Sequence, residues 1–151
     1  LDSLAISDEL KGDDFIDVGT GPGLPGIPLA ILNQDKNFTL LDSNGKKTRF
    51  LFQVKLELGL ANMSEVNKRV EEFNPQKTYD CVLSRAFSSL SDMVQNCQHL
   101  LNPDGYFLAM KGKLPQTELS QLPKNYKVEK LSSINVPGVD GQRHLIKIVK
   151  T

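Results

Sequence analysis

The sequence has no tryptophan, two cysteines, two histidines and equal numbers of acidic and basic side chains. Cys81 and Cys97 do not stand at metal-ligand spacing from His99 and His144, so no metal site is predicted. Both thiols are expected to be reduced, as in a cytoplasmic protein. No apolar run reaches the roughly 20 residues of a membrane span, and no signal peptide opens the chain, so no membrane contact is predicted.

The net charge of zero gives no overall signal for nucleic acid, but the charges are distributed unevenly. Residues 1–103 carry 10 Lys and Arg against 14 Asp and Glu, whereas residues 104–151 carry 8 against 4. A basic C-terminal third is weak support for a polyanion partner. A solvated surface of mixed charge explains the pattern about equally well.

A chain of 151 residues that is 39% hydrophobic and 24% charged is typical of one globular domain. It contains no repeat, low-complexity tract or linker, so residues 1–151 are predicted to form a single domain. The chain opens inside an amphipathic segment (Leu1, Leu4, Ala5 and Ile6), without Met. We therefore expect that an N-terminal part precedes it in the whole protein.

Short apolar runs alternate with helical patterns, which is typical of an α/β protein with a parallel sheet. The predicted strands are Phe15–Val18, Phe38–Leu41, Glu65–Asn67, Tyr79–Leu83, Tyr106–Met110, Tyr126–Val136 and His144–Val149. The predicted helices are Ile27–Leu32, Asn44–Leu58 and Ser88–Leu101, the last ended by a turn at Asn102–Gly105. The last two strands are too close in sequence for a crossover helix, so they are expected to be antiparallel. The prediction is a seven-stranded, doubly wound sheet.

The stretch "FIDVGTGPGLPGIP" places four glycines and three prolines directly after the first strand. In open α/β sheets, ligands bind at the carboxyl ends of strands, and glycines let a ligand lie against the backbone. Gly21–Gly26 matches the dinucleotide pattern G-x-G-x-x-G, although that match alone is weak. A turn that only packs a helix onto a strand is the alternative. No phosphate-binding lysine follows in the G-K-[ST] pattern.

Three features of this turn oppose a pyrophosphate. Pro22 and Pro25 remove backbone N–H groups that phosphates would need. Asp17 places a carboxylate at the strand end, where it repels a phosphate and attracts a cation. The first glycine after the strand is Gly19, which puts the pattern in the wrong register.

Asp42 ends the second predicted strand, where a carboxylate can accept hydrogen bonds from both ribose hydroxyls. The pocket thus favours a nucleoside, disfavours pyrophosphate and offers a carboxylate to a cation. S-adenosylmethionine fits, because it has an adenosine, a sulfonium and an ammonium but no phosphate.

The sequence resembles the RsmG family, also called glucose-inhibited division protein B, which methylates guanine N7 in small-subunit rRNA. The likeness rests on "FIDVGTGPGLPGIPLAI", "LLDSNGKKTRFL", "RVEEF", "SRAFSSL" and "VDGQRHL", from Phe15 to Leu145. The opening "LDSL" is similar to the end of the family's R-H-x-x-DS segment, and the helical region before it is absent. The resemblance implies a class I, Rossmann-like methyltransferase with a C-terminal antiparallel strand.

Cofactor contacts implied by the resemblance fall on Gly19, Leu24, Val70, Glu71 and Arg85. With the residues of the glycine turn and the second strand end, the predicted cofactor set is Asp17, Gly19, Thr20, Gly21, Gly23, Leu24, Asp42, Ser43, Val70, Glu71 and Arg85.

Guanine N7 carries no proton, so its attack on a sulfonium methyl needs no general base, and catalysis rests on orientation. The Asn/Asp-Pro-Pro-Tyr/Phe segment typical of amino-nitrogen methylation is absent, and Ser84–Phe87 stands there instead. Arg85 is the predicted catalytic residue, able to donate to guanine O6 or a carboxylate. Phe87 is a candidate for stacking the base, although a core position is the commoner fate of such a residue. Cys81 is expected to be a core thiol.

Two basic groups are candidates for RNA binding. The first is Lys46, Lys47 and Arg49, and the second is Lys111, Lys113, Arg143 and His144. Cations in the first turns of the Asn44–Leu58 helix oppose its dipole, and such broken local rules often mark function. The predicted RNA-binding residues are Lys46, Lys47, Arg49, Phe87, Lys111, Arg143 and His144.

The sequence therefore predicts a cytoplasmic, monomeric, S-adenosylmethionine-dependent methyltransferase that acts on guanine N7 of 16S rRNA in the small ribosomal subunit or its precursor. One alternative is a nicotinamide-dependent oxidoreductase that uses the G-x-G-x-x-G match. The other is a ribosome-binding module that keeps the fold without activity.

Overall fold

The computed structural model describes residues 2–112, 116–134 and 143–151. The strands are β1 (Asp14–Val18), β2 (Asn37–Asp42), β3 (Met63–Asn67), β4 (Tyr79–Ser84), β5 (Leu101–Lys111), β6 (Tyr126–Ile134) and β7 (Arg143–Lys150). The helices are α1 (Asp2–Ser7), α2 (Gly26–Leu32), α3 (Gly45–Leu58), α4 (Leu90–Cys97) and α5 (Gln116–Ser120). Two short 3-10 helices are η1 (Val70–Glu72) and η2 (Gln98–Leu100).

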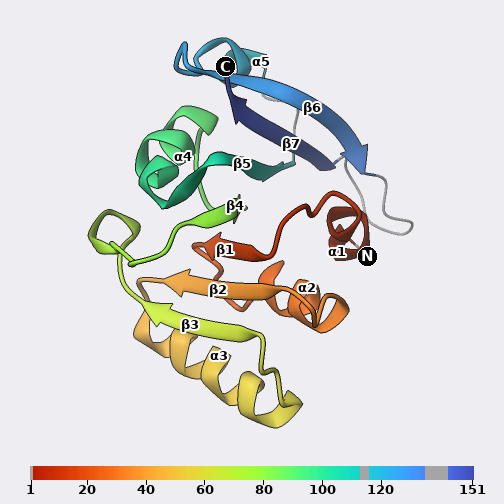
Figure 1. The fold of residues 1–151 in the computed structure, drawn as a ribbon, viewed down its shortest axis with the longest axis vertical. Helices are drawn as coiled ribbons and strands as arrows, with labels where there is room; N and C mark the ends of the chain where they lie inside the picture. Colours follow the sequence, from red (N-terminus) through yellow and green to blue (C-terminus); the bar gives the residue numbers. More distant parts are fainter. Residues whose placement is uncertain (1, 113–115, 135–142) are drawn as a thin grey trace.

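The strands form one seven-stranded sheet in the order β3-β2-β1-β4-β5-β7-β6 (Figure 1). β1 to β5 pair in parallel, whereas β7 lies antiparallel between β5 and β6. The predicted doubly wound sheet with antiparallel last strands is confirmed. The order reverses between β1 and β4, so the crevice where such sheets bind ligands lies above these two strands.

Each face of the sheet has its own apolar core, as expected when helices cover both sides. One core joins residues of α1, α2 and α3 to the sheet, with Ile6, Leu29 and Leu51 fully buried. The other joins α4 to the opposite face through Leu90 and Met93. Figure 1 shows α2 and α4 on opposite sides of the sheet. Cys81 is buried in the first core, which confirms it as a core thiol.

The helix boundaries follow the predicted capping residues. The Asn44 side chain accepts hydrogen bonds from the first-turn amides of α3, and Gly59 ends that helix with a left-handed conformation. Ser89 caps α4, which ends at Cys97, so the predicted helix Ser88–Leu101 is too long and its last turn is η2. Val136, at the end of the sixth predicted strand, lies outside the described residues.

The predicted turn at Asn102–Gly105 is wrong, because these residues belong to β5. The pairing of β5 with β4 shifts register here, so the segment bulges within the strand instead of ending it. Asp80 of β4 accepts a hydrogen bond from Asn102 at 2.7 Å, and its other oxygen accepts from the amides of Asp13 and Asp14. One carboxylate thus ties the bulge to the start of β1.

Candidate functional site

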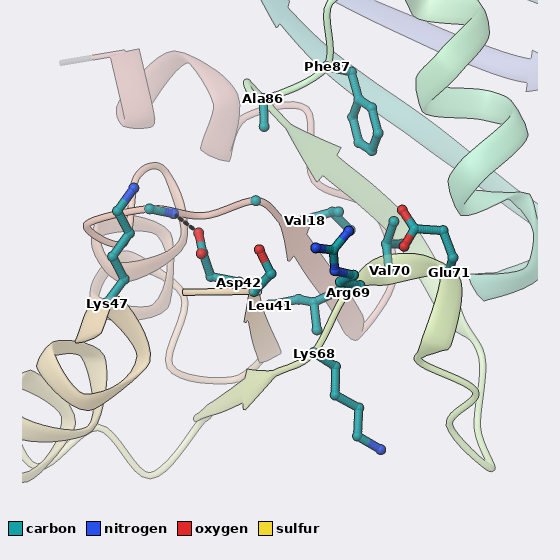
Figure 2. Close-up of a pocket in the computed structure, with 13 residues that line it drawn as sticks. Val18, Leu41, Asp42, Lys47, Lys68, Arg69, Val70, Glu71, Ala86 and Phe87 are labelled. Carbon is teal, nitrogen blue, oxygen red and sulfur yellow. Dashed lines mark hydrogen bonds between the residues drawn. The ribbon is translucent and has the colours of Figure 1, made fainter. Parts of the chain in front are cut away.

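A pocket of about 370 Å³ opens at the carboxyl ends of β1, β2 and β4, within the size range of small-molecule sites. Its walls come from the turn after β1, the end of β2, the first turn of α3, η1 and the segment after β4 (Figure 2). The lining residues are Val18, Gly19, Gly21, Leu41, Asp42, Ser43, Lys47, Lys68, Arg69, Val70, Glu71, Ala86 and Phe87.

The glycine turn has no backbone amide left for a phosphate. The amides of Gly19 and Thr20 donate to the Leu41 carbonyl, and those of Gly23 and Leu24 donate to the Thr20 carbonyl. The Gly21 and Gly26 amides donate to carboxylates, and the prolines at 22 and 25 have no N–H. Phosphate cradles depend on free amides, so this turn disfavours a dinucleotide pyrophosphate.

Two glycines of the turn are required by close packing and by backbone conformation. Gly19 has a φ of 68°, and a Cβ on it would lie 2.6 Å from the Cβ of Ala86. Gly23 has a φ of 96°, and a Cβ on it would lie 2.2 Å from Ile27. Both conformations are costly for other residues. The turn therefore touches the segment after β4 on one side and α2 on the other.

Asp17 lies beneath the turn and holds its shape. Its Oδ2 accepts hydrogen bonds from the Thr20 hydroxyl at 2.7 Å and the Gly26 amide at 3.0 Å. Burial raises the pKa of Asp17 from 3.8 to about 7, against the lowering effect of these hydrogen bonds and of the Arg85 charge. Oδ1 is buried and has no partner among the described residues. Asp17 and Thr20 thus lie behind the pocket wall rather than in it.

Asp42 faces the pocket from the end of β2 and also fixes two backbone groups. Its Oδ2 accepts a hydrogen bond from the Gly21 amide at 2.8 Å, drawn as a dashed line in Figure 2, and Oδ1 accepts from the Asn44 amide at 2.9 Å. Each carboxylate oxygen keeps further acceptor capacity. The carboxylate can therefore accept hydroxyl hydrogen bonds while holding the glycine turn to α3.

The segment around η1 forms the wall opposite the glycine turn. Val70 is buried, and Glu71 beside it is exposed and lines the pocket. Lys68 and Arg69, which precede them, also line the pocket, and sequence reasoning did not select either. Arg69 begins the motif "RVEEF" quoted above and Lys68 directly precedes it, and this was the signal that could have found them. In Figure 2 the Arg69 side chain points toward the middle of the pocket, whereas Lys68 points away.

The segment after β4 supplies the third wall. Ser84 is buried and donates to the Val18 carbonyl at 2.8 Å, and the Ala86 amide donates to the Ser84 hydroxyl at 3.0 Å. Phe87 is half-buried and lines the pocket with Ala86. Arg85 is exposed, does not line the pocket, and makes no hydrogen bond or ion pair with the described residues.

Lys47 is the one predicted RNA-binding cation that lines the pocket within the described part of the chain. Its Nζ lies 3.9 Å from the position a Cβ would take on Gly21, so the ammonium sits beside the glycine turn. Lys46 and Arg49 are exposed on α3, outside the pocket. Gly23 and Leu24 also lie outside the lining, with Leu24 41% exposed.

The second predicted basic group is not a set of free surface cations. Lys111 and His144 are cross-strand neighbours on β5 and β7, but His144 is only 6% exposed. Lys111 donates to the Phe87 carbonyl at 2.8 Å and pairs with Glu118 at 3.1 Å. A role of these two side chains in direct phosphate contact is therefore not favoured by their surroundings. Arg143 is exposed at the start of β7, and Lys113 lies outside the described residues.

Metal-type clusters and membrane-spanning helices are both absent from the described ranges. In residues 2–112, 116–134 and 143–151, no three His, Cys, Asp or Glu side chains gather as they do in metal sites. Among the helices of the same ranges, none has the length and apolarity needed to cross a membrane.

The fold is that of class I methyltransferases. TrmN from Thermus thermophilus superposes with a TM-score of 0.75 at 18% identity, over 99% of this chain and 47% of that one. A SAM-dependent O-methyltransferase from Thermotoga maritima superposes with a TM-score of 0.73 at 19% identity, over 99% of this chain and 64% of that one. At these identities the likeness defines the fold alone.

Sequence comparison narrows the class to one family. The family model described as rRNA small subunit methyltransferase G (GidB) matches residues 1–146. A relative from Shewanella halifaxensis, named ribosomal RNA small subunit methyltransferase G, is 54% identical over 99% of this chain and 72% of its own length. The chain therefore belongs to the GidB family of methyltransferases.

Proposed function

We propose that this chain transfers a methyl group from S-adenosylmethionine to N7 of a guanine in 16S rRNA. Membership of the GidB family supports rRNA of the small subunit as the substrate. The observation that carries the cofactor assignment is the glycine turn, whose amides are all used within the protein while two carboxylates stand at its ends.

The residues of the pocket fit S-adenosylmethionine. Asp42 would accept the ribose hydroxyls, and the apolar side chains of Leu41 and Val70 would flank the adenine, beside Glu71. Gly19 and Gly21 have no Cβ atoms, so the ligand would lie directly against the backbone of the turn. Ser43 would complete the pocket wall at the end of β2. Oδ1 of Asp17, which has no partner among the described residues, lies behind the turn, where an ionised carboxylate would provide a negative group for a cationic ligand.

When bound, this cofactor supplies an electrophilic methyl group on a sulfonium. The nucleophile is the N7 lone pair of guanine, which needs no deprotonation, so the protein's task is to orient the base and exclude water. Arg85 would donate to guanine O6 or to a carboxylate, and Phe87 would stack on the base.

The rRNA backbone would lie across the cations that surround the pocket. Lys47, Lys68 and Arg69 line it, and Lys46 and Arg49 continue the basic surface along α3. Such contacts position a nucleic acid without reading its sequence. Arg143, exposed on β7, is a further candidate contact. We also propose that the protein works as a cytoplasmic monomer on the small subunit or its precursor.

Equilibrium binding and a transfer assay test this function together. S-adenosylhomocysteine should bind at least tenfold more tightly than NADH, and labelled methyl should pass from S-adenosylmethionine to small-subunit rRNA as N7-methylguanosine. Tighter binding of NADH would favour the oxidoreductase alternative. Tight S-adenosylhomocysteine binding without any transfer, by a protein that spans the full length of its relatives, would favour a ribosome-binding module without activity.

A further inference from the structure

The segment Arg85–Ser89, which follows β4, is held by a charged pair outside the pocket. Lys111 at the end of β5 donates to the Phe87 carbonyl at 2.8 Å and pairs with Glu118 Oε1 at 3.1 Å. The same Glu118 oxygen accepts a hydrogen bond from the Leu90 amide at 3.0 Å. Glu118 therefore acts on the segment through Lys111 at Phe87, and directly on Leu90, the residue that follows the segment and begins α4.

This charged pair is shielded from solvent more than most surface pairs. The side chains of Lys111 and Glu118 are 15% and 24% exposed. Partial removal from water strengthens attraction between opposite charges, and each partner also makes a hydrogen bond to the backbone. Removal of the carboxylate would leave the Leu90 amide without its acceptor and the Lys111 ammonium without its counter-charge.

The segment has little freedom to move without changing the pocket. At its start, the buried Ser84 binds both the Val18 carbonyl and the Ala86 amide. Ala86 packs so closely on Gly19 that a Cβ there would lie 2.6 Å away. A shift of Phe87 and Leu90 would therefore displace the pocket wall that Ala86 and Phe87 form.

We propose that Glu118 is a positioning residue for methyl transfer, which fixes the Arg85–Ser89 segment against the pocket through Lys111 and the Leu90 amide. The proposal rests on the proposed function and assigns a role to α5, a short helix in which no residue is buried. Because no residue of α5 is buried, the loss of Glu118 should displace the segment while the chain stays folded.

The absence of tryptophan allows a direct measurement of the segment's position. Phe87→Trp places a single tryptophan in the pocket wall. When Glu118→Ala is added, the tryptophan emission should shift to longer wavelength, and quenching of the tryptophan by acrylamide should rise about twofold. Both are measured at temperatures well below unfolding. The matched control is Glu129→Ala, because Glu129 pairs with Lys147 at 3.4 Å on β6 and β7. The control should leave emission and quenching unchanged.

Kinetics in the chain with Phe87 intact complete the test. Glu118→Ala should lower kcat for rRNA methylation about tenfold with a smaller change in KM for the cofactor. Glu118→Gln should recover part of the loss, since its amide oxygen can still accept from the Leu90 amide. Unchanged emission and quenching in Glu118→Ala, or a wild-type kcat, would overturn the proposal. If the unaltered chain transfers no methyl group, the proposed function fails, whereas the emission comparison still decides whether Glu118 holds the segment.

Discussion

The two turns that meet at the pocket are built in opposite ways. The turn after β1 is held from within, because its amides and the Thr20 hydroxyl donate to carbonyls and carboxylates of β1, β2 and the turn itself. The segment after β4 is held from outside, by Ser84 at one end and by Lys111 and Glu118 at the other. Its Arg85 side chain makes no hydrogen bond or ion pair with the described residues.

This difference separates two tasks of a group-transfer site. A turn whose amides are all hydrogen-bonded has a fixed shape, and it presents a cofactor with the carboxylate of Asp42. A segment with an exposed arginine and a half-buried phenylalanine keeps side chains available for a second substrate. Binding of cofactor should therefore depend mainly on the first turn, and the transfer step mainly on the second.

The largest effect is expected at the second turn. Arg85→Ala should lower methyl transfer at least about a hundredfold, because a positioned donor to the transition state is lost. The fold should remain intact, since the side chain is exposed at a strand end. A filter-binding transfer assay on small subunits measures the loss, with Lys150→Ala as the control for removal of an exposed cation. Wild-type turnover in Arg85→Ala would show that the arginine has no part in transfer.

At the first turn, Asp42→Ala should weaken binding of S-adenosylhomocysteine by roughly 1–3 kcal/mol, through lost charge-assisted hydrogen bonds and a freed Gly21 amide. Isothermal titration calorimetry measures this difference. Asp42→Asn should lose less, because its amide oxygen can still accept, and Asp104→Ala, at an exposed acid, should bind as the unaltered chain does. Equal affinities in all four proteins would remove Asp42 from the ribose role.

The buried carboxylate under the first turn should make stability depend on pH. The pKa of Asp17 is raised to about 7, so between roughly pH 4 and pH 7 the folded state holds a proton that the unfolded state has lost. The contribution of Asp17 to the free energy of unfolding therefore falls as pH rises, by up to about 1.4 kcal/mol per pH unit.

Urea unfolding at several pH values measures this dependence, with Asp17→Asn as the reference that cannot titrate. Relative to Asp17→Asn, the unaltered chain should lose stability as pH rises through this window. A difference between the two proteins that stays constant across the window would mean that Asp17 is ionised throughout.

The smallest effect is expected where the pocket meets the RNA backbone. Lys47→Ala should weaken binding of small-subunit rRNA a few-fold. It should also reduce the slope of the logarithm of the binding constant against the logarithm of salt concentration by about one. Lys127→Ala, which removes an exposed lysine on β6, is the matched control. If both variants have the same salt dependence, Lys47 makes no phosphate contact.

Much of this arrangement could be predicted from the sequence, because strands, helix caps and glycine turns have local signals. The alternation of apolar runs predicted the sheet, and the carboxylate at the end of β2 lies at the pocket as expected. The prolines in the turn correctly predicted that it has little to offer a phosphate.

Other features depend on contacts that no local pattern reports. The direction of the Asp17 side chain, inward beneath the turn, follows from the path of the turn as a whole. The environment of Lys111 depends on Glu118 from α5 and on a carbonyl 24 residues earlier in the chain. A lysine counted as a surface cation in the sequence is therefore a partly buried structural partner in the fold.

The central claim is methyl transfer to guanine N7 of small-subunit rRNA, and its most direct test is made on cellular RNA. Mass spectrometry should compare 16S rRNA from cells with and without this protein. The account predicts that one N7-methylguanosine disappears, returns when the gene is restored, and stays absent when the restored gene carries Arg85→Ala. A full complement of N7-methylguanosine in the cells that lack the protein would contradict it.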